Sequence, residues 1–553
     1  MSLLDHTRTT HCGRTLLCCL LGFSCAVALV LALAGAPGRA AAATPVAPVF
    51  DPAALSGPLG TVVTEHKLTN PAPIFYGLFG SAVAISGDTA LVSCPNQTVD
   101  GTDYVGAVYV YVRNGSTWTK QAELDEPTGV TGDHFGTSVA ISGNTAVAGA
   151  PGRTVSGKTG AGAVYVFTRT GTTWGTPTEL TATDAAASDQ LGWSVAFSGG
   201  TVVAGAYDKT VGGLQEGAAY VFTGSGSTWS QQQKLTPTDP ANTSAFGVSA
   251  AVSGDTALIG STDSQVSVSG GKTQDGGAFI FTRSGTTWSQ RAELIESATD
   301  YNGWDRFGTT VALDGGTAVV GARDKMVSGS DAGAAYVFTG SGASWPQQAR
   351  LLAPYAAEGN AFGNAVAVSG NEALVGCSHL TAPDESSNGV GAAFLFTRSA
   401  GTWSQPFAIR ASDFAGNDAF GCAVGISGTL AVIGADTKTV SGLSDAGAAY
   451  AKQLPGAPTP AVSLKASAHK VKKGKKLTLS GVVKNYDSSA KSVVIERKIK
   501  TKLVRLKSVA CTKSGSFKWV WKAGKAGKWV FLAVYKLNGT AYASKTITVT
   551  VHR

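Results

Sequence analysis

Short apolar runs separated by glycine-containing turns dominate this chain, and they return in the same order along most of its length. Residues 135–180 show that order: VAIS, a two-residue turn, TAVAGA, then GAVYVFTR, a second glycine turn and a last run that ends in TEL. Apolar runs of about six residues bounded by turn residues predict strands. Turns this short predict antiparallel neighbours. We therefore expect a unit of four antiparallel strands.

Two sequence markers show that the unit recurs. A Phe-Gly or Leu-Gly pair opens it at Phe79, Phe135, Leu191, Phe246, Phe307, Phe362 and Phe420. A tryptophan late in the unit keeps the same spacing, at Trp118, Trp174, Trp229, Trp288, Trp345 and Trp403. Two markers in phase predict a repeat protein. A four-stranded sheet of this size buries both faces only when several copies stack around an axis, which predicts a β-propeller.

The two ends of the repeat region predict how the ring closes. The seventh unit stops after residues 447–453, GAAYAKQ, without its tryptophan-bearing strand. In most units the Leu or Ile that ends the last strand stands 11 residues before the next Phe-Gly pair, and Leu68 stands 11 residues before Phe79. We expect the segment 61–69 to supply the missing strand, because a closed ring has no open sheet edge. The prediction is a seven-bladed propeller over residues 59–453.

The pattern FG…VAIS…TAVAGAP…GAVYVF…W resembles the FG-GAP repeat, which is known from the seven-bladed propeller of integrin alpha chains and from many bacterial surface proteins. The resemblance covers about two-thirds of the chain. It implies the propeller fold and an extracellular setting, but not integrin function. Integrin-type units commonly carry a calcium loop between the first two strands. Here that position holds short turns with too few oxygen ligands for calcium, so we expect no metal or cofactor; the turns begin at Ser86, Ser142, Ser198, Ser253 and Asp314.

The strand order assigns the connections to two faces, and the longer, more variable loops share one of them. These loops join strands two and three of a unit, or the last strand to the next unit, and variable loops on a rigid scaffold commonly carry binding sites. The candidate ligand-binding residues in these loops are Asp103, Arg153, Tyr207, Asp208, Asp263, Arg323, Asp324, His379 and Asp436. Four aspartates two residues before the Phe-Gly position favour capping of their own turns over ligand contact; they are Asp133, Asp189, Asp305 and Asp418.

Residues 1–43 have the pattern of a targeting segment. Arg8 and Arg14 precede an apolar run over residues 16–36, and small residues follow it. This is typical of a secretory signal peptide, although the run is long enough that an uncleaved signal anchor is the alternative. Both interpretations predict export, with the remainder of the chain secreted or at the cell surface.

The C-terminal part differs in composition and charge. Residues 454–460 read as a linker, and strand-like runs over residues 461–553 predict a β-sandwich that resembles the Ig-like modules of bacterial surface proteins. These last residues hold 22 Lys and Arg against two acidic residues, a net charge of +20, so the first 460 carry 22 basic and 34 acidic residues, a net of −12. A lysine-rich domain of this charge predicts association with anionic polymers of the cell envelope. Phe517, Trp519 and Trp521 favour a sandwich core over a sugar-binding strip.

No motif for catalysis is present. The histidines after the signal segment lie in different units or strands, without the spacing of a zinc site or a catalytic base. Cys94 and Cys377 end the second strands of blades one and six, and Cys422 opens blade seven, which neighbours both. One disulfide from Cys422, with Cys377 as the candidate partner, is one interpretation in an exported protein; isolated buried thiols are the other. We expect an exported, non-enzymatic, monomeric binding or adhesion protein with a protein or glycan ligand and no specific nucleic acid. A carbohydrate-active enzyme and a purely structural envelope protein are the alternatives.

Overall fold

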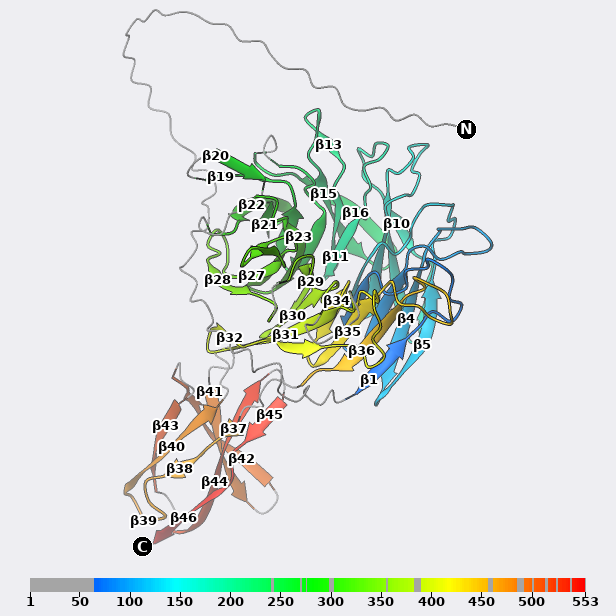
Figure 1. Cartoon of the computed structure of the whole chain (residues 1–553). Helices are drawn as coiled ribbons and strands as arrows, with labels where there is room; N and C mark the ends of the chain where they lie inside the picture. The colour runs from blue at the N-terminus through cyan, green and yellow to red at the C-terminus, as the bar shows by residue number, and fades with distance from the viewer. Residues whose placement is uncertain are drawn as a thin grey trace, which may run out of the picture. The chain divides into compact units, whose positions relative to one another are not determined.

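The computed structural model describes residues 64–239, 243–268, 271–274, 276–297, 303–354, 357–381, 389–455, 461–484, 492–499, 502–512, 516–523, 526–537 and 540–552 (Figure 1). The predicted signal segment, residues 1–43, and most of the predicted linker lie outside them. The secondary structure of the described residues consists of β-strands. Within these ranges there is no helix with the length and apolar character needed to cross a membrane.

Seven antiparallel sheets form the repeat region, as the sequence predicts, and each is one blade of the propeller. Blade 1 contains β2 (Val83–Ser86), β3 (Thr89–Cys94), β4 (Ala107–Asn114) and β5 (Thr117–Leu124). Blade 2 contains β6 (Ser138–Ser142), β7 (Thr145–Ala150), β8 (Ala163–Thr170), β9 (Thr173–Trp174) and β10 (Thr178–Leu180). Blade 3 contains β11 (Ser194–Ser198), β12 (Thr201–Ala206), β15 (Ala218–Ser225) and β16 (Thr228–Leu235).

Blades 4 to 7 repeat the same strand order. Blade 4 contains β17 (Ser249–Ser253), β18 (Thr256–Ser261), β21 (Gly277–Ser284) and β22 (Thr287–Leu294), and blade 5 contains β23 (Phe307–Asp314), β24 (Thr317–Ala322), β27 (Ala334–Thr339) and β28 (Gln347–Leu351). Blade 6 contains β29 (Phe362–Ser369), β30 (Glu372–Cys377), β31 (Ala392–Ser399), β32 (Thr402–Trp403) and β33 (Phe407–Ile409). Blade 7 contains β34 (Val424–Ser427), β35 (Leu430–Ala435), β36 (Ala448–Gln453) and β1 (Glu65–Leu68).

The first strand of each blade lies innermost, since the first strands of adjacent blades contact one another around the whole ring. The third strands are deeply buried: in every blade their first five residues are buried, because both faces of the strand pack against neighbouring blades. This explains why these runs are continuously apolar and do not alternate with polar residues.

The Phe-Gly pair that marks each repeat joins neighbouring blades. Phe79 is fully buried against Tyr109 of its own blade, with ring centroids 5.5 Å apart, and its backbone N–H donates to Ala446 O of blade 7 at 3.0 Å. Gly80 adopts φ +97°, and a Cβ added there would lie 2.4 Å from Ala448 O of blade 7. Only glycine satisfies both the positive φ and this approach to a neighbouring backbone, which explains why the pair recurs.

The N-terminal strand closes the ring in the predicted register. Strand β1 pairs with β36 of blade 7, and Leu68 lies opposite Ala449. Leu124, which ends the fourth strand of blade 1, lies opposite Val108 in the same way. Blade 7 therefore combines three strands from the end of the repeat region with one from its beginning, and the prediction of closure is confirmed.

The structure also contains two features that the sequence pattern did not predict. The fourth strand is interrupted by a bulge in blades 1, 3, 4 and 5, and in blades 2 and 6 it is split into two short strands around Pro177 and Pro406, which have no N–H to donate to the ladder. Three loops between second and third strands contain small hairpins of their own: β13 (Thr210–Val211) with β14 (Leu214–Gln215), β19 (Gln265–Val268) with β20 (Gly271–Gln274), and β25 (Met326–Val327) with β26 (Ser330–Asp331).

The C-terminal region forms two β-sheets over a shared hydrophobic cluster. Phe517 and Trp521 are buried in that cluster and Trp519 packs against it, which confirms their interpretation as core residues. One sheet contains β37 (Ala461–Val462), β38 (Lys465–Ala466), β40 (Lys476–Lys484) and β43 (Ser516–Lys522). The other contains β39 (Lys470–Lys472), β41 (Ser492–Ile499), β42 (Lys502–Ala510), β44 (Gly527–Leu537), β45 (Thr540–Ala543) and β46 (Ile547–His552).

Candidate functional site

Exposed apolar side chains mark one face of the propeller. Within each blade the connection between strands two and three, and the link from strand four to the next blade, emerge at the same end of the sheet; we call this end the loop face. Nine large apolar side chains of the described propeller residues are exposed, and all nine lie in these connections: Phe75, Tyr76, Tyr104, Val130, Trp193, Leu214, Trp304, Met326 and Phe414. Concentration on one face is typical of an interaction surface.

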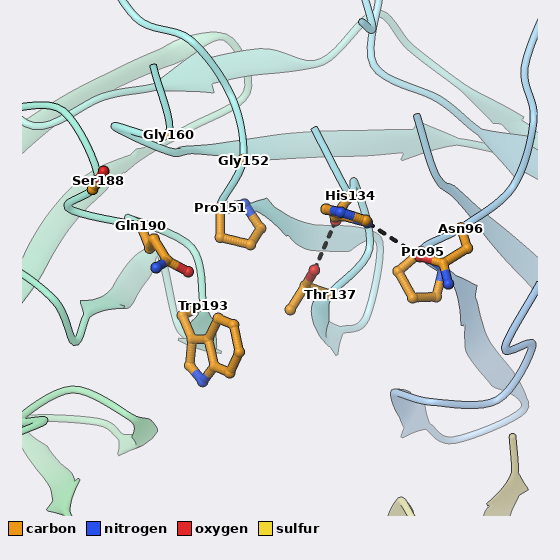
Figure 2. A pocket seen from close by; sticks show the side chains of 10 residues that line it. All are labelled: Pro95, Asn96, His134, Thr137, Pro151, Gly152, Gly160, Ser188, Gln190 and Trp193. Atoms are coloured by element: carbon orange, nitrogen blue, oxygen red, sulfur yellow. Dashed lines mark hydrogen bonds between the residues drawn. The ribbon is translucent and has the colours of Figure 1, made fainter. Parts of the chain in front are cut away.

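A cleft of about 340 Å³ opens on the loop face where the connections of blades 1, 2 and 3 meet (Figure 2). Trp193 and Gln190 lie on one side, His134, Asn96 and Pro95 on the other. The complete lining is Pro95, Asn96, His134, Thr137, Pro151, Gly152, Gly160, Ser188, Gln190 and Trp193. This volume is at the lower end of the range for sites that bind small ligands.

A repeated backbone conformation presents two of these side chains. The residue before the Phe-Gly or Leu-Gly pair has a positive φ in all seven blades, although it is never glycine: Leu78, His134, Gln190, Ala245, Arg306, Ala361 and Ala419. A non-glycine residue in this region costs free energy that the surrounding structure must offset. In blades 2 and 3 the residue is His134 (φ 52°) and Gln190 (φ 57°), and both line the cleft.

Hydrogen bonds fix the polar side of the cleft. The Nδ1 atom of His134 lies 3.1 Å from Asn96 Oδ1, and the Nδ2 atom of Asn96 donates to Tyr76 O at 3.0 Å. Thr137 donates through Oγ1 to the carbonyl oxygen of His134 at 2.8 Å (Figure 2). Both heteroatoms of the Asn96 amide are therefore engaged, and Asn96 orients the imidazole ring.

The opposite side combines an aromatic pair with an amide. The rings of Trp193 and Tyr207 pack with centroids 4.6 Å apart. Gln190 donates through Nε2 to Asp208 Oδ2 at 2.5 Å. Tyr207 and Asp208, two predicted candidates, thus support residues of the lining without forming part of it.

The structure places Arg153 and Asp103 in contacts within the protein. Arg153 is largely buried, donates to Asp133 Oδ2 at 3.0 Å and pairs with Glu179. Asp103 is exposed and accepts a hydrogen bond from Thr98 Oγ1 at 2.8 Å. Arg153 therefore has a structural role between blades.

The remaining predicted candidates are spread over blades 4 to 7 and do not converge on the cleft. Asp324 pairs with Arg306 at 3.2 Å and with Arg323 at 3.5 Å. Burial raises the pKa of Asp436. His379 is exposed and its Nδ1 lies 3.0 Å from Ser378 Oγ, while Asp263 is half-buried beside Thr262.

A repeated buried ion pair explains the aspartates that precede the Phe-Gly position. Each Asp side chain accepts a hydrogen bond from a Lys or Arg 20 residues further along: Asp133 from Arg153, Asp189 from Lys209, Asp305 from Lys325 and Asp418 from Lys438. Three of the aspartates also accept from a backbone N–H three residues earlier, so the capping interpretation is confirmed for Asp133, Asp189 and Asp418. The repeated 20-residue spacing is the sequence signal that would have revealed the cationic partners.

The proposed disulfide is not formed in the structure. Cys94, Cys377, Cys422 and Cys511 are free thiols. Cys377 donates to Asn360 O at 3.2 Å, whereas Cys422 donates to Gly80 O at 3.6 Å across the border between blades 7 and 1. The two sulfurs thus serve separate backbone carbonyls, and the second interpretation, isolated thiols, describes the structure.

Glu126 is an ionisable group with an altered pKa that does not line the cleft. Burial, with a smaller contribution from the carboxylate of Asp133, raises the pKa of Glu126 to about 8. Glu126 is 5% exposed, and neither oxygen of its carboxyl group has a hydrogen-bond partner. No carboxylate is among the residues that line the cleft. In the described residues no group of three or more His, Cys, Asp and Glu could hold a metal ion.

Sequence reasoning missed the residues that form the cleft: His134, Gln190 and Trp193 were not candidates. These three directly flank the Phe-Gly or Leu-Gly pairs of blades 2 and 3, and the flanking positions vary strongly from unit to unit. Variation beside a recurring structural motif was the available signal.

A family model for the FG-GAP repeat matches seven segments: residues 63–111, 118–167, 174–222, 229–281, 288–338, 345–396 and 403–451. The chain belongs to the FG-GAP repeat family. Each FG-GAP unit runs from the fourth strand of one blade to the third strand of the next, and the first unit therefore includes β1. The family model and the strand pairing agree on how the FG-GAP propeller closes.

No curated protein matches this FG-GAP chain. A solved structure, an engineered structural-genomics target, is 18% identical over 21% of this chain and 23% of its own, with a TM-score of 0.15. The chain thus spans less than a quarter of that protein, and the likeness carries no argument about fold or function.

Proposed function

We propose that this chain is an exported binding protein, of the adhesion type, whose loop face binds a protein or glycan ligand at the cell surface or outside the cell. The observation that carries the proposal is the exposure of nine large apolar side chains on the loop face of the propeller. Trp304 is 65% exposed and Phe75 58% exposed. Aromatic side chains with this exposure are favourable anchors for a partner because they bury a large area with few torsions to fix.

Binding without catalysis fits the chemistry of the cleft better than hydrolysis does. Enzymes that cleave glycosidic bonds use two carboxyl groups that flank the bond. The residues that line the cleft include no carboxyl group. Glu126, whose carboxyl group has a raised pKa, is buried and does not line the cleft. We therefore favour a binding protein over a carbohydrate-active enzyme, and the exposed aromatic face favours a ligand over a purely architectural role.

The C-terminal region, which we propose to be an Ig-like module, would hold the protein near anionic envelope polymers. Five lysines that are close in sequence are all exposed where β39 leads into β40: Lys470, Lys472, Lys473, Lys475 and Lys476. Clustered ammonium groups attract phosphate-rich or carboxylate-rich polymers without requiring one fixed geometry.

The test of ligand binding uses the full exported chain on protein and glycan arrays. A combined variant, Trp193→Ser with Trp304→Ser and Phe414→Ser, should lose the bound ligand. Val520→Ser is the matched control, since Val520 is 49% exposed but lies in the C-terminal region. Retention of the ligand by the combined variant, or no ligand for the parent chain, would contradict the proposed function.

The test of the basic module measures retention of the full chain on immobilised poly(glycerol phosphate). Retention should weaken steeply as salt shortens the Debye length from ~10 Å at 0.1 M to ~3 Å at 1 M. Replacing the five clustered lysines with glutamine should move elution to lower salt, and neutral dextran should not retain the chain. Retention that is indifferent to salt would exclude this role.

A further inference from the structure

The cleft between blades 1, 2 and 3 has no formal charge from Asp, Glu, Lys or Arg in its lining. Asp208, which contacts the lining residue Gln190, and Arg153, which follows Gly152, are already engaged by the protein. Asp208 accepts from Gln190 Nε2 at 2.5 Å, and Arg153 donates to Asp133 Oδ2 at 3.0 Å and to Thr128 Oγ1 at 2.6 Å. A charged ligand would lose its hydration here without gaining an opposite charge, which is unfavourable.

The contacts made within the protein leave acceptor atoms of three side chains in the cleft. Because Nδ1 of His134 faces the acceptor Asn96 Oδ1, the imidazole in its neutral form carries its proton on Nδ1 and presents Nε2 as an acceptor. Gln190 uses one N–H of its Nε2 within the protein, which leaves Oε1 and the second N–H. Thr137 donates its hydroxyl proton to His134 O, which leaves the lone pairs of Oγ1. A matching ligand must therefore bring several uncharged donors.

Trp193 supplies the apolar part of the site. It is 36% exposed, borders the cleft, and its ring is packed against that of Tyr207. An aromatic ring supported in this way offers a rigid flat surface at little entropic cost. A pyranose ring has a flat face of C–H groups and a rim of hydroxyl donors, so it matches both the indole surface and the acceptors opposite.

From these features we infer that the cleft is a saccharide site that takes an uncharged pyranose, with Trp193 beneath the sugar ring and His134, Gln190 and Thr137 accepting from its hydroxyl groups. A volume of about 340 Å³ admits one or two sugar units. This inference rests on the proposed function and names the chemical class of ligand for one part of the loop face.

The test uses the full exported chain and a panel of methyl glycosides of neutral hexoses and N-acetylhexosamines. Methyl glucuronide serves as the charged counterpart of methyl glucoside. Saturation-transfer NMR should detect at least one neutral glycoside, and isothermal titration calorimetry should give its affinity. Trp193→Ala should weaken that affinity by at least about tenfold, whereas Trp193→Phe, which keeps an aromatic surface, should retain most of it.

Trp304→Ala is the matched control, because Trp304 is an exposed tryptophan of the loop face that does not line the cleft. It should bind the same glycoside within about twofold of the parent chain. Near-ultraviolet circular dichroism establishes that each variant is folded.

Three results would overturn the inference: no neutral glycoside binds, Trp193→Ala binds as well as Trp304→Ala, or the glucuronide binds as tightly as the glucoside. If the arrays identify a ligand that depends on the loop face while no glycoside enters the cleft, the saccharide site is wrong and the proposed binding function stands. If neither is found, both fail.

Discussion

Closure of the ring by β1 predicts a large, local loss of stability when that strand is altered. Leu68 is 3% exposed and packs into the cluster between blades 7 and 1. Truncation of a buried leucine to alanine costs about 2–5 kcal/mol through lost transfer free energy and the cavity that remains. Leu68→Ala is therefore expected to lower the free energy of unfolding of the propeller by about this amount.

Deletion of residues 44–70 should cost more than the truncation, because an ion pair and a strand edge are lost as well. Lys452 on β36 is only 2% exposed at its side chain and pairs with Glu65 of β1. Removing one partner of a buried pair costs about 3–5 kcal/mol. Together with Leu68 this approaches the total stability of a typical domain, about 5–15 kcal/mol. The deletion variant should be unfolded or should associate through the exposed edge of β36.

The assay is guanidinium unfolding followed by tryptophan fluorescence, with size-exclusion chromatography to detect association. Leu124→Ala is the matched control: Leu124 is also 3% exposed and occupies the same register position in blade 1, where its strand is continuous with the blade. The two truncations should cost similar free energies. If Leu124→Ala costs several kcal/mol while Leu68→Ala or the deletion leaves the midpoint unchanged, β1 does not hold the ring closed.

Three further predictions concern the glycines, pH and metal. Gly192→Ala should destabilise the propeller by more than about 2 kcal/mol, since φ is +92° and the new Cβ would lie 2.5 Å from Ala163 O. Gly143→Ala, in an open turn with no atom within 4 Å of the new Cβ, should destabilise it by only about 1 kcal/mol. Thermal unfolding measures both effects. The pKa of Glu126 is raised to about 8 in the folded protein, above the value of about 4.3 expected in the unfolded chain. The contribution of Glu126 to the free energy of unfolding should therefore be greatest below about pH 4.3 and be lost as the pH rises through 8. The melting temperature of Glu126→Gln should fall less than that of the parent chain between pH 5 and pH 9, and equal slopes would contradict the burial argument. EDTA should leave the melting temperature of the propeller unchanged, because the turns between first and second strands offer too few oxygen ligands; a fall that calcium restores would show that these turns bind calcium.

The amino-acid sequence by itself determined the fold of the repeat region. Apolar runs at fixed spacing predicted the blades, and the position of Leu68 relative to Phe79 predicted the closing strand. These inferences held because the first requirement of a blade is local: apolar residues of suitable length separated by turns, with a glycine where backbones of adjacent blades meet. The same pattern recurs in every repeat, so the blades can be recognised even though the individual copies differ in sequence.

The candidate site depended on tertiary structure. Arg153 looked like a loop residue free to bind a ligand, yet folding places it against Asp133, 20 residues earlier in the chain. The cleft residues Asn96, His134 and Trp193 come from three blades, so their proximity follows from the ring and from no single repeat. Which polar atoms remain available also depends on contacts made after folding, as Asn96 and Gln190 show. Sequence periodicity specifies where strands lie, whereas the chemistry of the loop face is set by which loops the closed ring brings together.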